Sequence, residues 1–485
     1  NDEADILDAY ILILQDPEIL EQLNQKQDIS IDTVYEIFTS TAQIFESMED
    51  EYFKQRAEDI ISVGKHLIFN MQNIDIKISL DDNTILIASD LTPADTSSMD
   101  LSKVSGIILK EGGFTSHAVI VAKNLGIPCV IGVKELLDNI TSGESITIDG
   151  SNGDIIISPN DNQISTLQDK QGKIEKLIQN FTEEKYKKLG LEFRVNIVSL
   201  EEINAFNHSF LNSIGLFRSE FIYLDNSTNP TLEQQSSVLE KITQKFTGTI
   251  VYRTLDIGGD KQVSYLNLPA EDNPFLGVRG IRLSLNNLDL FDSQVRSILN
   301  SESLEKIKIM FPMISTIEDF LEAKEFVNKI AKDLNVESPP IGIMVETPSS
   351  AFIADKFSEI VDFISIGTND LTQYIMAADR GNSNLSHYHD PLHPAVLRAI
   401  SNVIDCCNAN NIEVSVCGEM SSDPVSALAL YILGLETFSM APSAAPFVFD
   451  VLNTNSEINK QRTKETILSL NNAQQIRKTI QEIIS

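Results

Sequence analysis

The sequence predicts a multidomain α/β protein with a helical N-terminal segment, a small α/β domain and a C-terminal (β/α)8 barrel. Three observations support this fold class. The chain of 485 residues has the length of about three domains. After residue 190, eight strand-like apolar runs are separated mostly by helical patterns, which is typical of a closed barrel of parallel strands. Before that point the patterns are first purely helical and then short and β-rich.

The first predicted domain, residues 1–72, shows only helical patterns. An apolar stripe within residues 2–14 is interrupted at Asp16-Pro17-Glu18, where a second helix begins. Further helices are expected over about 30–48 and 51–71. We expect this domain to be truncated at its N-terminus, because the first residue is not Met and the helical pattern is already under way there. The domain carries no catalytic pattern, which favours a docking or a capping role.

The second predicted domain, residues 73–159, is a compact α/β unit. Its strand-like runs are separated by turn signals such as Asp149-Gly150-Ser151-Asn152-Gly153. The runs lie at 84–88, 105–109, 129–133, 145–149 and 154–158. One helix is expected to begin near residue 117, directly after a glycine-containing turn.

That helix start is the first candidate functional site. The sequence Gly112-Gly113-Phe114-Thr115-Ser116-His117 leads from a strand into an apolar helical run. Thr115 or Ser116 can cap the helix, and the unpaired N–H groups and partial positive charge of a helix N-terminus suit a phosphate. One hypothesis is that His117 is a nucleophile that carries a phosphoryl group. A capping turn with an incidental histidine is an equally good interpretation of these residues alone.

Residues 160–190 are polar, charged and helix-prone, and they are interpreted as a helical linker. The third predicted domain, residues 191–485, contains the barrel. Its strands are expected at 193–199, 214–218, 249–255, 307–314, 341–346, 363–367, 413–417 and 437–441. In such barrels, the chemistry collects at the C-terminal ends of the strands.

Basic residues are frequent near these strand ends. In a chain with a formal net charge of −33, clustered arginines indicate a pocket for a small polyanion, because guanidinium groups bind phosphate and carboxylate bidentately. The candidate substrate-binding residues are Arg218, Arg253, Lys261, Arg279, Arg282 and Arg380. Structural ion pairs would explain one or two of the polar residues at strand ends, but they explain poorly all six of them, Arg218, Arg253, Glu346, Asn369, Asp370 and Cys417.

Polar residues of other types follow the remaining strands. Glu346 and Asp370 offer the oxygen ligands that Mg²⁺ prefers, and Mg²⁺ commonly keeps waters and substrate phosphate as its other ligands. Asn369 can donate to a phosphate or carbonyl oxygen. Cys417 ends a buried strand and is either a proton donor or a small core residue. An anion pocket, a divalent cation, a thiol acid and a remote histidine acceptor together describe phosphoryl transfer.

Composition limits the partners. The strongly acidic balance argues against a nucleic acid partner and suits a basic protein partner better, although acidity also serves solubility. The four cysteines, of which Cys417 is one, lack metal-ligand spacing and indicate reduced thiols in a cytoplasmic protein. No apolar run is long enough to span a bilayer and no signal peptide is visible, so no membrane association is expected.

Several long motifs resemble one known family. They are GGFTSHAVIVAKNLGIP, GLFRSEFIYLD, RTLDIGGDK, NPFLGVRGIRL, IMFPMI, IMVETPSSA, SIGTNDLTQYIMAADRGN, HDPLHPAVL and VCGEM. Together they are similar to the phosphoenolpyruvate-protein phosphotransferases, the enzymes I of the bacterial sugar phosphotransferase system. The resemblance covers essentially the whole chain. It implies transfer of phosphate from phosphoenolpyruvate to a histidine of the enzyme and then to the phosphocarrier protein HPr, which drives sugar uptake.

The resemblance also implies a role for individual residues. His117 matches the histidine that is phosphorylated at Nε2, and Cys417 matches the thiol that protonates the enolate to give pyruvate. The other matches are the phosphoenolpyruvate-binding Arg218, Arg253 and Arg380, the phosphate contact Asn369, and the Mg²⁺ ligands Glu346 and Asp370. In that family the helical domain docks HPr and the TIM barrel mediates homodimerisation. The domain that holds His117 is expected to swivel between barrel and carrier.

The sequence departs from the family pattern at one position of the histidine motif, and two other assignments of function stay open. Phe114 stands where the family commonly has Arg, so a polar contact beside the phosphohistidine is expected to be missing. A pyruvate phosphate dikinase or phosphoenolpyruvate synthase shares the histidine motif, but these enzymes need an ATP-grasp domain, for which this sequence shows no pattern. A nitrogen-regulatory paralogue of enzyme I would have the same barrel and differ in its carrier.

Overall fold

The computed structural model divides into two compact units, Asn1–Gln168 and Asp169–Ser485. The described residues are 13–24, 26, 29–46, 57, 60–61, 63–65, 67–68, 71, 80–89, 91, 95–96, 99–110, 118–119, 121–122, 127–133, 140–150, 152–199, 202, 210–224, 228–258, 263–266, 268, 271–380 and 382–485. Two predicted site residues, His117 and Lys261, lie outside the described residues, as does Phe114.

The first unit begins with two helices, α2 (Pro17–Asn24) and α3 (Ile31–Glu46). Pro17 opens α2, and the carboxylate of Asp16 accepts a hydrogen bond from the backbone N–H of Ile19 at 3.3 Å. Ser30 caps α3 in the same way through the N–H of Thr33. The apolar faces of the two helices form one small core around Phe38. The described residues between 57 and 71 are also helical, which agrees with the helix predicted there.

The same unit contains two small sheets. Strands β1 (Thr84–Ala88), β2 (Val104–Leu109) and β3 (Cys129–Ile131) pair in parallel. Strands β4 (Ile146–Asp149) and β5 (Asp154–Ile157) form an antiparallel hairpin. Gly153 in its turn has a positive φ of 79°, which explains the glycine that ends the predicted turn signal. The five β-rich runs predicted for this part of the chain are therefore strands.

Two helices occupy the predicted linker. Helix α7 (Asp161–Asn180) has no buried residue, and the division between the two units falls within it. Helix α8 (Glu183–Leu189) is capped by the side chain of Thr182 and ends at Gly190, which has a φ of 70°. Exposed ion pairs, Lys187–Glu183 and Lys188–Glu184, join successive turns of α8 at 2.7 Å each.

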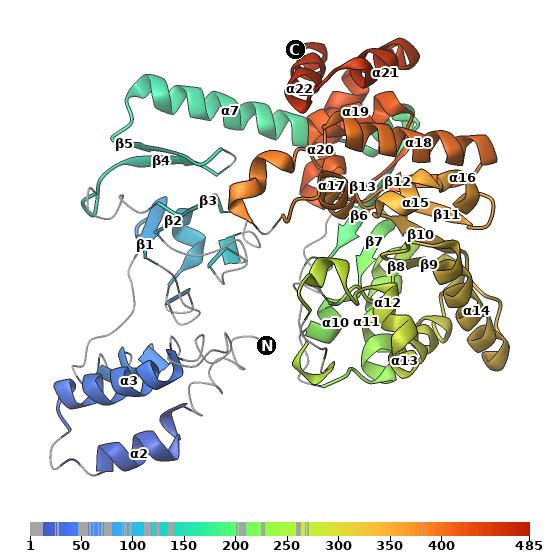
Figure 1. Ribbon diagram of the computed structural model, residues 1–485. Coiled ribbons are helices and arrows are strands. Elements are labelled where there is room, and N and C mark those ends of the chain that lie inside the picture. The colour runs from blue at the N-terminus through green and yellow to red at the C-terminus, as the bar shows by residue number, and fades with distance from the viewer. Residues whose placement is uncertain are drawn as a thin grey trace. The chain divides into compact units, whose positions relative to one another are not determined.

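The second unit is a closed barrel of eight parallel strands, as predicted (Figure 1). The last strand pairs with the first through Met440 and Val195, which closes the ring. Most strand residues are buried on both faces, which is why the strands are nearly continuous apolar runs. The strands are β6 (Glu192–Ile197), β7 (Ile214–Arg218), β8 (Ile250–Arg253), β9 (Ile307–Phe311), β10 (Ile341–Val345), β11 (Phe363–Ile366), β12 (Glu413–Val416) and β13 (Thr437–Met440).

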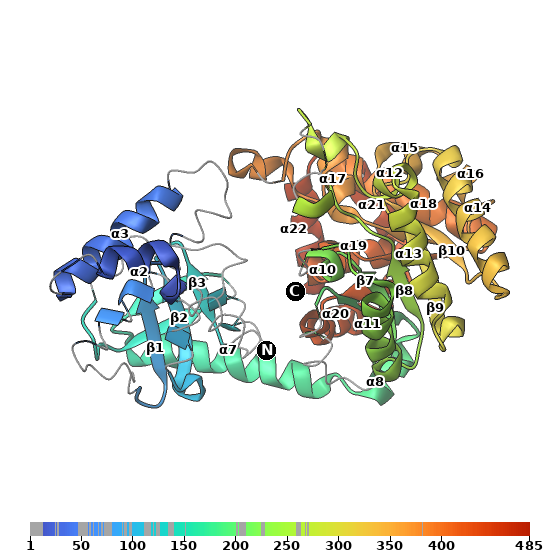
Figure 2. The same ribbon diagram turned by 90° about the horizontal axis from the view of Figure 1, so that it is seen from below.

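Helices surround these strands, as the two views in Figures 1 and 2 show. Thr231 and Thr316 begin two of the longer helices with capping boxes, and prolines occupy the first turn of several others. The helices are α10 (Phe221–Leu224), α11 (Leu232–Lys245), α12 (Ile281–Asn286), α13 (Leu288–Leu299), α14 (Ile317–Leu334), α15 (Pro348–Phe352), α16 (Ala354–Phe357), α17 (Thr368–Met376), α18 (Pro394–Asn410), α19 (Pro424–Leu433), α20 (Ala445–Thr454), α21 (Lys460–Ser469) and α22 (Ala473–Ile484).

Most predicted barrel strands end earlier in the structure than in the prediction, and two of these differences bear on the candidate site. The run predicted at 307–314 ends at Phe311, because Met313 adopts a left-handed conformation with a φ of 55°. The run predicted at 249–255 ends at Arg253, after which the chain turns so that Asp256 faces the barrel mouth. Both deviations lie at the C-terminal ends of strands, where functional residues of such barrels are found.

A charged network fills the opposite end of the barrel. Arg194 on β6 donates to Glu413 on β12 at 2.8 Å, and Lys308 on β9 donates to the other oxygen of Glu413 at 2.7 Å. Strands β9 and β12 are not neighbours, so these side chains meet inside the barrel. The network closes the amino-terminal end and leaves the carboxyl-terminal end for chemistry.

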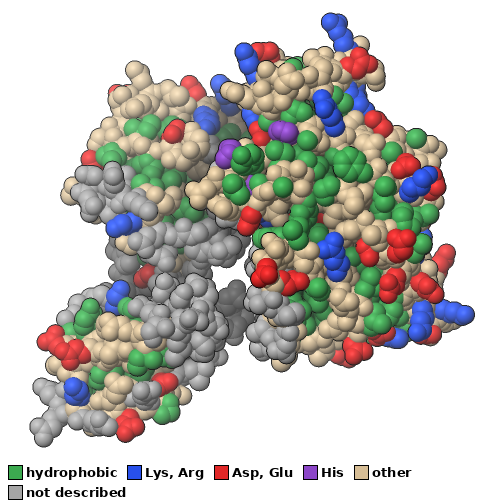
Figure 3. Space-filling model, viewed as in Figure 1, with side chains coloured by type: hydrophobic (Ala, Val, Ile, Leu, Met, Phe, Trp, Pro, Cys, Tyr) green, Lys and Arg blue, Asp and Glu red, His purple; other side chains and the backbone are tan. Residues whose placement is uncertain are grey.

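Charged side chains are spread over the described part of the face that Figure 3 shows. On the described part of the face in Figure 3, acidic and basic side chains are scattered among apolar ones. None of the helices in the described part of the chain combines the length and apolar character that crossing a bilayer requires.

Candidate active site

Polar side chains converge at the carboxyl-terminal end of the barrel, as the sequence predicts. Arg218 and Arg253 are the last residues of β7 and β8, and Glu346 directly follows β10. Only Gly367 separates β11 from α17, so Asn369 and Asp370 lie in the first turn of that helix. Cys417 directly follows β12. All these positions lie at one end of the barrel, because its strands are parallel.

The centre of this cluster is a buried network of arginines and carboxylates. Arg253 donates through Nη2 to Glu220 Oε1 at 2.6 Å, and its Nη1 lies 3.1 Å from Asp256 Oδ2. Arg279 donates through Nη2 to the same Asp256 Oδ2 at 3.0 Å. Each of these four side chains is at most 4% exposed. Asp256 therefore bridges the two arginines and orients both guanidinium groups.

The buried carboxylates of this network stabilise the charged form of Arg253. Burial alone would lower the pKa of Arg253, but the carboxylates of Glu220 and Asp256 raise it above its usual value. Arg253 also has a buried Nε without a hydrogen-bond partner among the described residues. A buried N–H donor without a partner is costly, so this nitrogen is a candidate donor to a bound anion.

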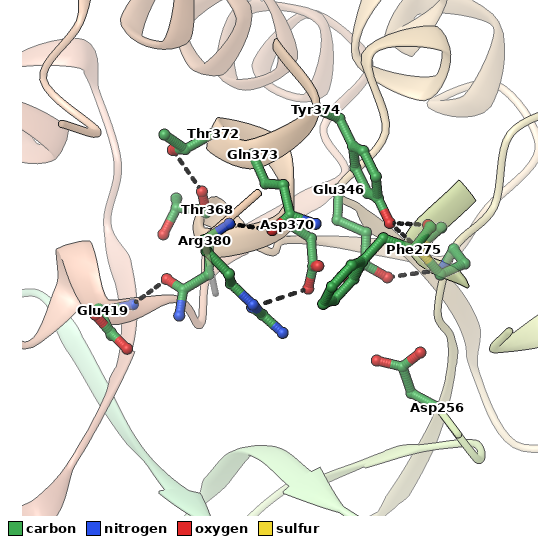
Figure 4. Close-up of polar contacts among 12 residues, drawn as sticks. Asp256, Phe275, Glu346, Thr368, Asp370, Thr372, Gln373, Tyr374, Arg380 and Glu419 are labelled. Carbon is green, nitrogen blue, oxygen red and sulfur yellow. Dashed lines mark hydrogen bonds and ion pairs between the residues drawn. The ribbon is translucent and has the colours of Figure 1, made fainter. Parts of the chain in front are cut away.

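A second group of polar side chains lies on and just after α17, and Figure 4 shows Asp370, Gln373 and Arg380 of this group. Arg279 donates through Nη1 to Asp370 Oδ1 at 3.2 Å, and Arg380 Nη1 lies 3.7 Å from Asp370 Oδ2. Gln373 accepts a hydrogen bond from the backbone N–H of Arg380 at 3.0 Å. Asp370 thus lies between two arginines, and three of the predicted substrate-binding arginines, Arg253, Arg279 and Arg380, belong to one connected cluster.

Glu346 is the most deeply buried carboxylate of the predicted set, at 1% exposure. Its Oε1 accepts a hydrogen bond from the backbone N–H of Met313 at 2.6 Å, which the left-handed conformation of Met313 makes possible. Burial, together with the negative charges of Asp370 and Asp256, raises the pKa of Glu346 to about 8. The negative charges of Glu346, Asp370 and Asp256 thus repel one another at this point.

These donors fit a Mg²⁺ ion. Glu346 and Asp370 are two buried carboxylates that repel each other, and a divalent cation would relieve that repulsion. In the described part of the chain, no group of three or more His, Cys, Asp or Glu side chains is arranged to hold a metal. Two carboxylates are nevertheless enough for Mg²⁺, which usually takes its other ligands from water and substrate phosphate.

Cys417 lies inside the barrel mouth and is 4% exposed. Its side chain packs with Met344, Phe363 and other apolar residues of the strands. Burial raises the pKa of Cys417 to about 11, so the thiol carries its proton at neutral pH. A buried, protonated thiol meets the first requirement of a proton donor, and the same burial is what a core residue would show.

The other predicted residues have different surroundings. Arg218 is 37% exposed, and its Nε lies 4.0 Å from Glu220. Asn369 accepts a hydrogen bond from the backbone N–H of Glu419 at 3.1 Å, which orients its amide. Arg282 donates to the carbonyl oxygens of Leu276 and Gly277 at 3.1 Å each and to Ser315 at 3.0 Å. Its donors are thus engaged in holding a loop, and its predicted substrate contact stays a prediction.

Sequence reasoning did not identify several residues of this cluster. Glu220 follows Arg218 by two positions, and Asp256 follows Arg253 by three. An acidic residue shortly after an arginine at a strand end could therefore have indicated both. Phe275, Met313 and Tyr374 join the cluster through contacts between distant segments, for which the sequence contains no local pattern.

Comparisons with known proteins cover nearly the whole chain. Three family models match: "PEP-utilising enzyme, N-terminal" at residues 1–56, "PEP-utilising enzyme, mobile domain" at 80–153, and "PEP-utilising enzyme, PEP-binding domain" at 172–455. The phosphoenolpyruvate-protein phosphotransferase of Bacillus subtilis (strain 168) is 38% identical over 98% of this chain and 87% of its own length. Those of Bacillus sp. (strain S) and Geobacillus stearothermophilus are each 36% identical over 98% of this chain and 86% of their own length.

Proposed function

This chain belongs to the PEP-utilising enzymes, as a phosphoenolpyruvate-protein phosphotransferase, and from that premise we propose how its residues divide the reaction. The barrel mouth binds phosphoenolpyruvate, His117 accepts the phosphoryl group, and a phosphocarrier protein of the HPr type receives it next. The observation that carries this assignment is the buried bridge of Arg253, Asp256 and Arg279 at the C-terminal end of the barrel. It presents fixed guanidinium groups to an anionic substrate.

Phosphoenolpyruvate carries both groups that arginines recognise, a phosphate and a carboxylate. Arg253, Arg218 and Arg380 bind these anionic groups, and Asn369 donates to the phosphate. The unpartnered Nε of Arg253 supports its part in this role. Glu346 and Asp370 would hold Mg²⁺, which would neutralise charge on the phosphate. Lys261 and Arg282 stay as further candidates for substrate contact.

The chemical step breaks the bond between phosphorus and the enol oxygen. Nε2 of His117 supplies the electron pair for the new phosphorus–nitrogen bond, and the enolate of pyruvate leaves. The Cys417 thiol then donates its proton to the terminal carbon of the enolate, which gives pyruvate and a thiolate. Solvent returns a proton to the thiolate before the next cycle. The raised pKa of Cys417 supports this role, because the thiol is protonated when the enolate forms.

Delivery of the phosphoryl group involves the other predicted domains. The helical domain at 1–72 docks the carrier, the domain at 73–159 carries His117, and the helical linker at 160–190 lets that domain alternate between donor and carrier. Two copies of the chain associate through their barrels. The carrier serves sugar uptake, as the family name implies.

The test is a transfer assay with the full chain. The enzyme is incubated with Mg²⁺ and phosphoenolpyruvate labelled in its phosphate, freed of substrate, and mixed with a purified HPr-type carrier. We expect label to move from the enzyme to a histidine of the carrier. Label that enters only with ATP as the donor would favour the dikinase or synthase alternative, and an enzyme that takes no label from phosphoenolpyruvate would contradict the proposal.

A further inference from the structure

An aromatic pair, Phe275 and Tyr374, contacts two arginines of the candidate site. Phe275 lies in a 3₁₀ turn (Pro274–Leu276) of the loop between β8 and α12, and Tyr374 lies on α17. The Phe275 ring centroid is 5.9 Å from Cζ of Arg279 and 5.8 Å from Cζ of Arg380. Both distances are within the range of a cation–π interaction. One ring therefore contacts the guanidinium groups of two different segments.

The Tyr374 hydroxyl joins the same elements through hydrogen bonds. It donates to the backbone carbonyl of Phe275 at 2.5 Å and accepts from Nη1 of Arg279 at 3.3 Å. Figure 4 shows Tyr374, Phe275, Asp370 and Arg380 in one cluster. Burial raises the pKa of Tyr374 to about 12, so the hydroxyl keeps the proton that it donates. The side chain of Tyr374 thus ties the position of the Phe275 backbone to the orientation of Arg279.

The loop that presents Phe275 is held by Glu271 and Arg282, which bind the backbone directly after the ring. Glu271 accepts hydrogen bonds from the N–H of Val278 at 3.1 Å through both carboxylate oxygens. A β-carbon at Gly277 would collide with that carboxylate, so a larger residue there would displace Glu271 from these hydrogen bonds. Arg282 also donates hydrogen bonds to the carbonyl oxygens of Leu276 and Gly277. These contacts fix the turn, so the ring is placed by the loop and not by the arginines alone.

We infer that Phe275 and Tyr374 are positioning residues of the anion site, which hold the guanidinium groups of Arg279 and Arg380 in place for a phosphate-bearing ligand. Without the ring, the ion pair with Asp370 at 3.7 Å is the one remaining contact of the Arg380 guanidinium group among the described residues, and the Arg380 side chain is 30% exposed. It would then sample other rotamers and bind the ligand at a greater entropic cost. Without the Tyr374 hydroxyl, the loop and Arg279 lose their shared hydrogen-bond partner.

The inference rests on the proposed function and predicts a specific kinetic pattern. Positioning of the anion-binding arginines affects ligand affinity more than the chemical step, so it raises KM and leaves kcat nearly unchanged. In Phe275→Leu, we expect KM for phosphoenolpyruvate to rise about three- to tenfold, because contacts to two cations are lost. In Tyr374→Phe, we expect a rise of about two- to fivefold. In the double variant, KM should rise by less than the product of the two single increases, because Phe275 and Tyr374 contact each other and the same arginine.

Two controls separate positioning from simple packing. Phe275→Tyr keeps the aromatic face and should restore KM to within about twofold of the unaltered chain. Tyr431→Phe removes a similar hydrogen bond, from Tyr431 to the carbonyl of Ser456 at 3.1 Å, on helix α19 outside the described cluster. This variant should leave KM unchanged. An unchanged KM in Phe275→Leu would overturn the inference. So would a rise in KM in Phe275→Tyr or in Tyr431→Phe that equals the rise in Phe275→Leu.

A second measurement does not depend on turnover. The unaltered chain and its variants are titrated with inorganic phosphate by calorimetry, and Phe275→Leu should weaken phosphate binding by a factor similar to its effect on KM. If the unaltered chain binds phosphate and Phe275→Leu weakens that binding while phosphoenolpyruvate is not turned over, the proposed function fails and this inference stands. If phosphate affinity is the same in both chains, or if neither chain binds phosphate, the inference fails.

Discussion

Arg279 donates from both Nε and Nη2 to the carboxylate of Asp256, at 3.3 Å and 3.1 Å to Oδ1, and both residues are buried. Asp256 also pairs with Arg253, so this one carboxylate fixes two guanidinium groups at the mouth of the barrel. The arrangement resembles a preorganised anion site, in which the orientation of the cations is set before the substrate binds.

The first prediction concerns this bridge. Asp256→Asn keeps the shape of the side chain but leaves Arg253 and Arg279 with one negative charge fewer. We expect the free energy of unfolding of the barrel to fall by about 3 kcal/mol, the usual cost of breaking a buried ion pair. Because the chain has no Trp, urea unfolding is best followed by circular dichroism.

The matched control for this variant is Asp355→Asn. Asp355 is exposed and lies 3.4 Å from the equally exposed Lys356. Its replacement should change the free energy of unfolding by less than about 1 kcal/mol. Equal losses in the free energy of unfolding would show that the Asp256 bridge stabilises the fold no more than an exposed ion pair does.

The second prediction concerns Cys417. If the thiol protonates the enolate, Cys417→Ala should lower kcat by about a hundredfold or more while KM changes little. Since burial raises the pKa of Cys417 to about 11, the thiol stays protonated as the pH rises from 6 to 9. The Cys417-dependent step should therefore be independent of pH over this interval and should slow only as the pH approaches 11.

The measurement for Cys417 is steady-state kinetics of pyruvate release between pH 6 and 9. A buried core residue makes a different prediction, namely loss of stability with normal turnover per folded molecule. Unchanged kcat in Cys417→Ala would therefore support the core interpretation and remove Cys417 from the reaction.

The third prediction concerns the metal. Glu346→Gln removes one of the two proposed carboxylate ligands, so the Mg²⁺ concentration for half-maximal labelling from phosphoenolpyruvate should rise at least about tenfold. Treatment with a chelator should stop labelling of the unaltered chain, and added Mg²⁺ should restore it. Labelling that continues at the same rate with excess chelator would contradict the assignment of Glu346 and Asp370 as metal ligands.

The fourth prediction concerns the opposite end of the barrel. Burial would raise the pKa of Glu413, but the hydrogen bonds and charges of Arg194 and Lys308 outweigh it and lower the pKa to about 2. A carboxylate with a lowered folded-state pKa stabilises the fold above its unfolded-state pKa, near 4. That stabilisation is lost as the pH falls towards 2.

Glu413→Gln tests this linkage. The difference in free energy of unfolding between the unaltered chain and Glu413→Gln should be full at pH 6 and smaller at pH 3. Enzyme kinetics should change little, because the network lies at the amino-terminal ends of the strands. A difference that is constant from pH 6 to pH 3 would show that Glu413 does not titrate as described.

The barrel and much of its mouth could be predicted from sequence because they depend on local patterns. Buried parallel strands are apolar along their whole length, and the residues that end them necessarily meet at one end of the barrel. Arg253, Glu346, Asp370 and Cys417 were found in this way. The motifs around them, compared with a known family, then implied a substrate and a reaction.

The remaining parts depend on contacts between distant segments. Tyr374 and Phe275 are 99 positions apart, and their hydrogen bond exists only because α17 and the loop after β8 meet above the barrel. Met313 supplies its N–H to Glu346 from a left-handed conformation that its residue type does not favour. Arg282 looked like a ligand contact in a basic motif, while the structure uses its donors to hold a loop.

The central claim is that His117 accepts the phosphoryl group of phosphoenolpyruvate. Its most direct test is labelling with phosphoenolpyruvate that carries radioactive phosphate, in the presence of Mg²⁺, for the unaltered chain and for His117→Ala. His387→Ala is the matched control, because His387 is an exposed histidine of the barrel unit, and its ring lies next to that of Tyr388. We predict acid-labile label on the unaltered chain and on His387→Ala, and none on His117→Ala, which should still bind phosphoenolpyruvate by calorimetry. Label retained on His117→Ala would contradict the account.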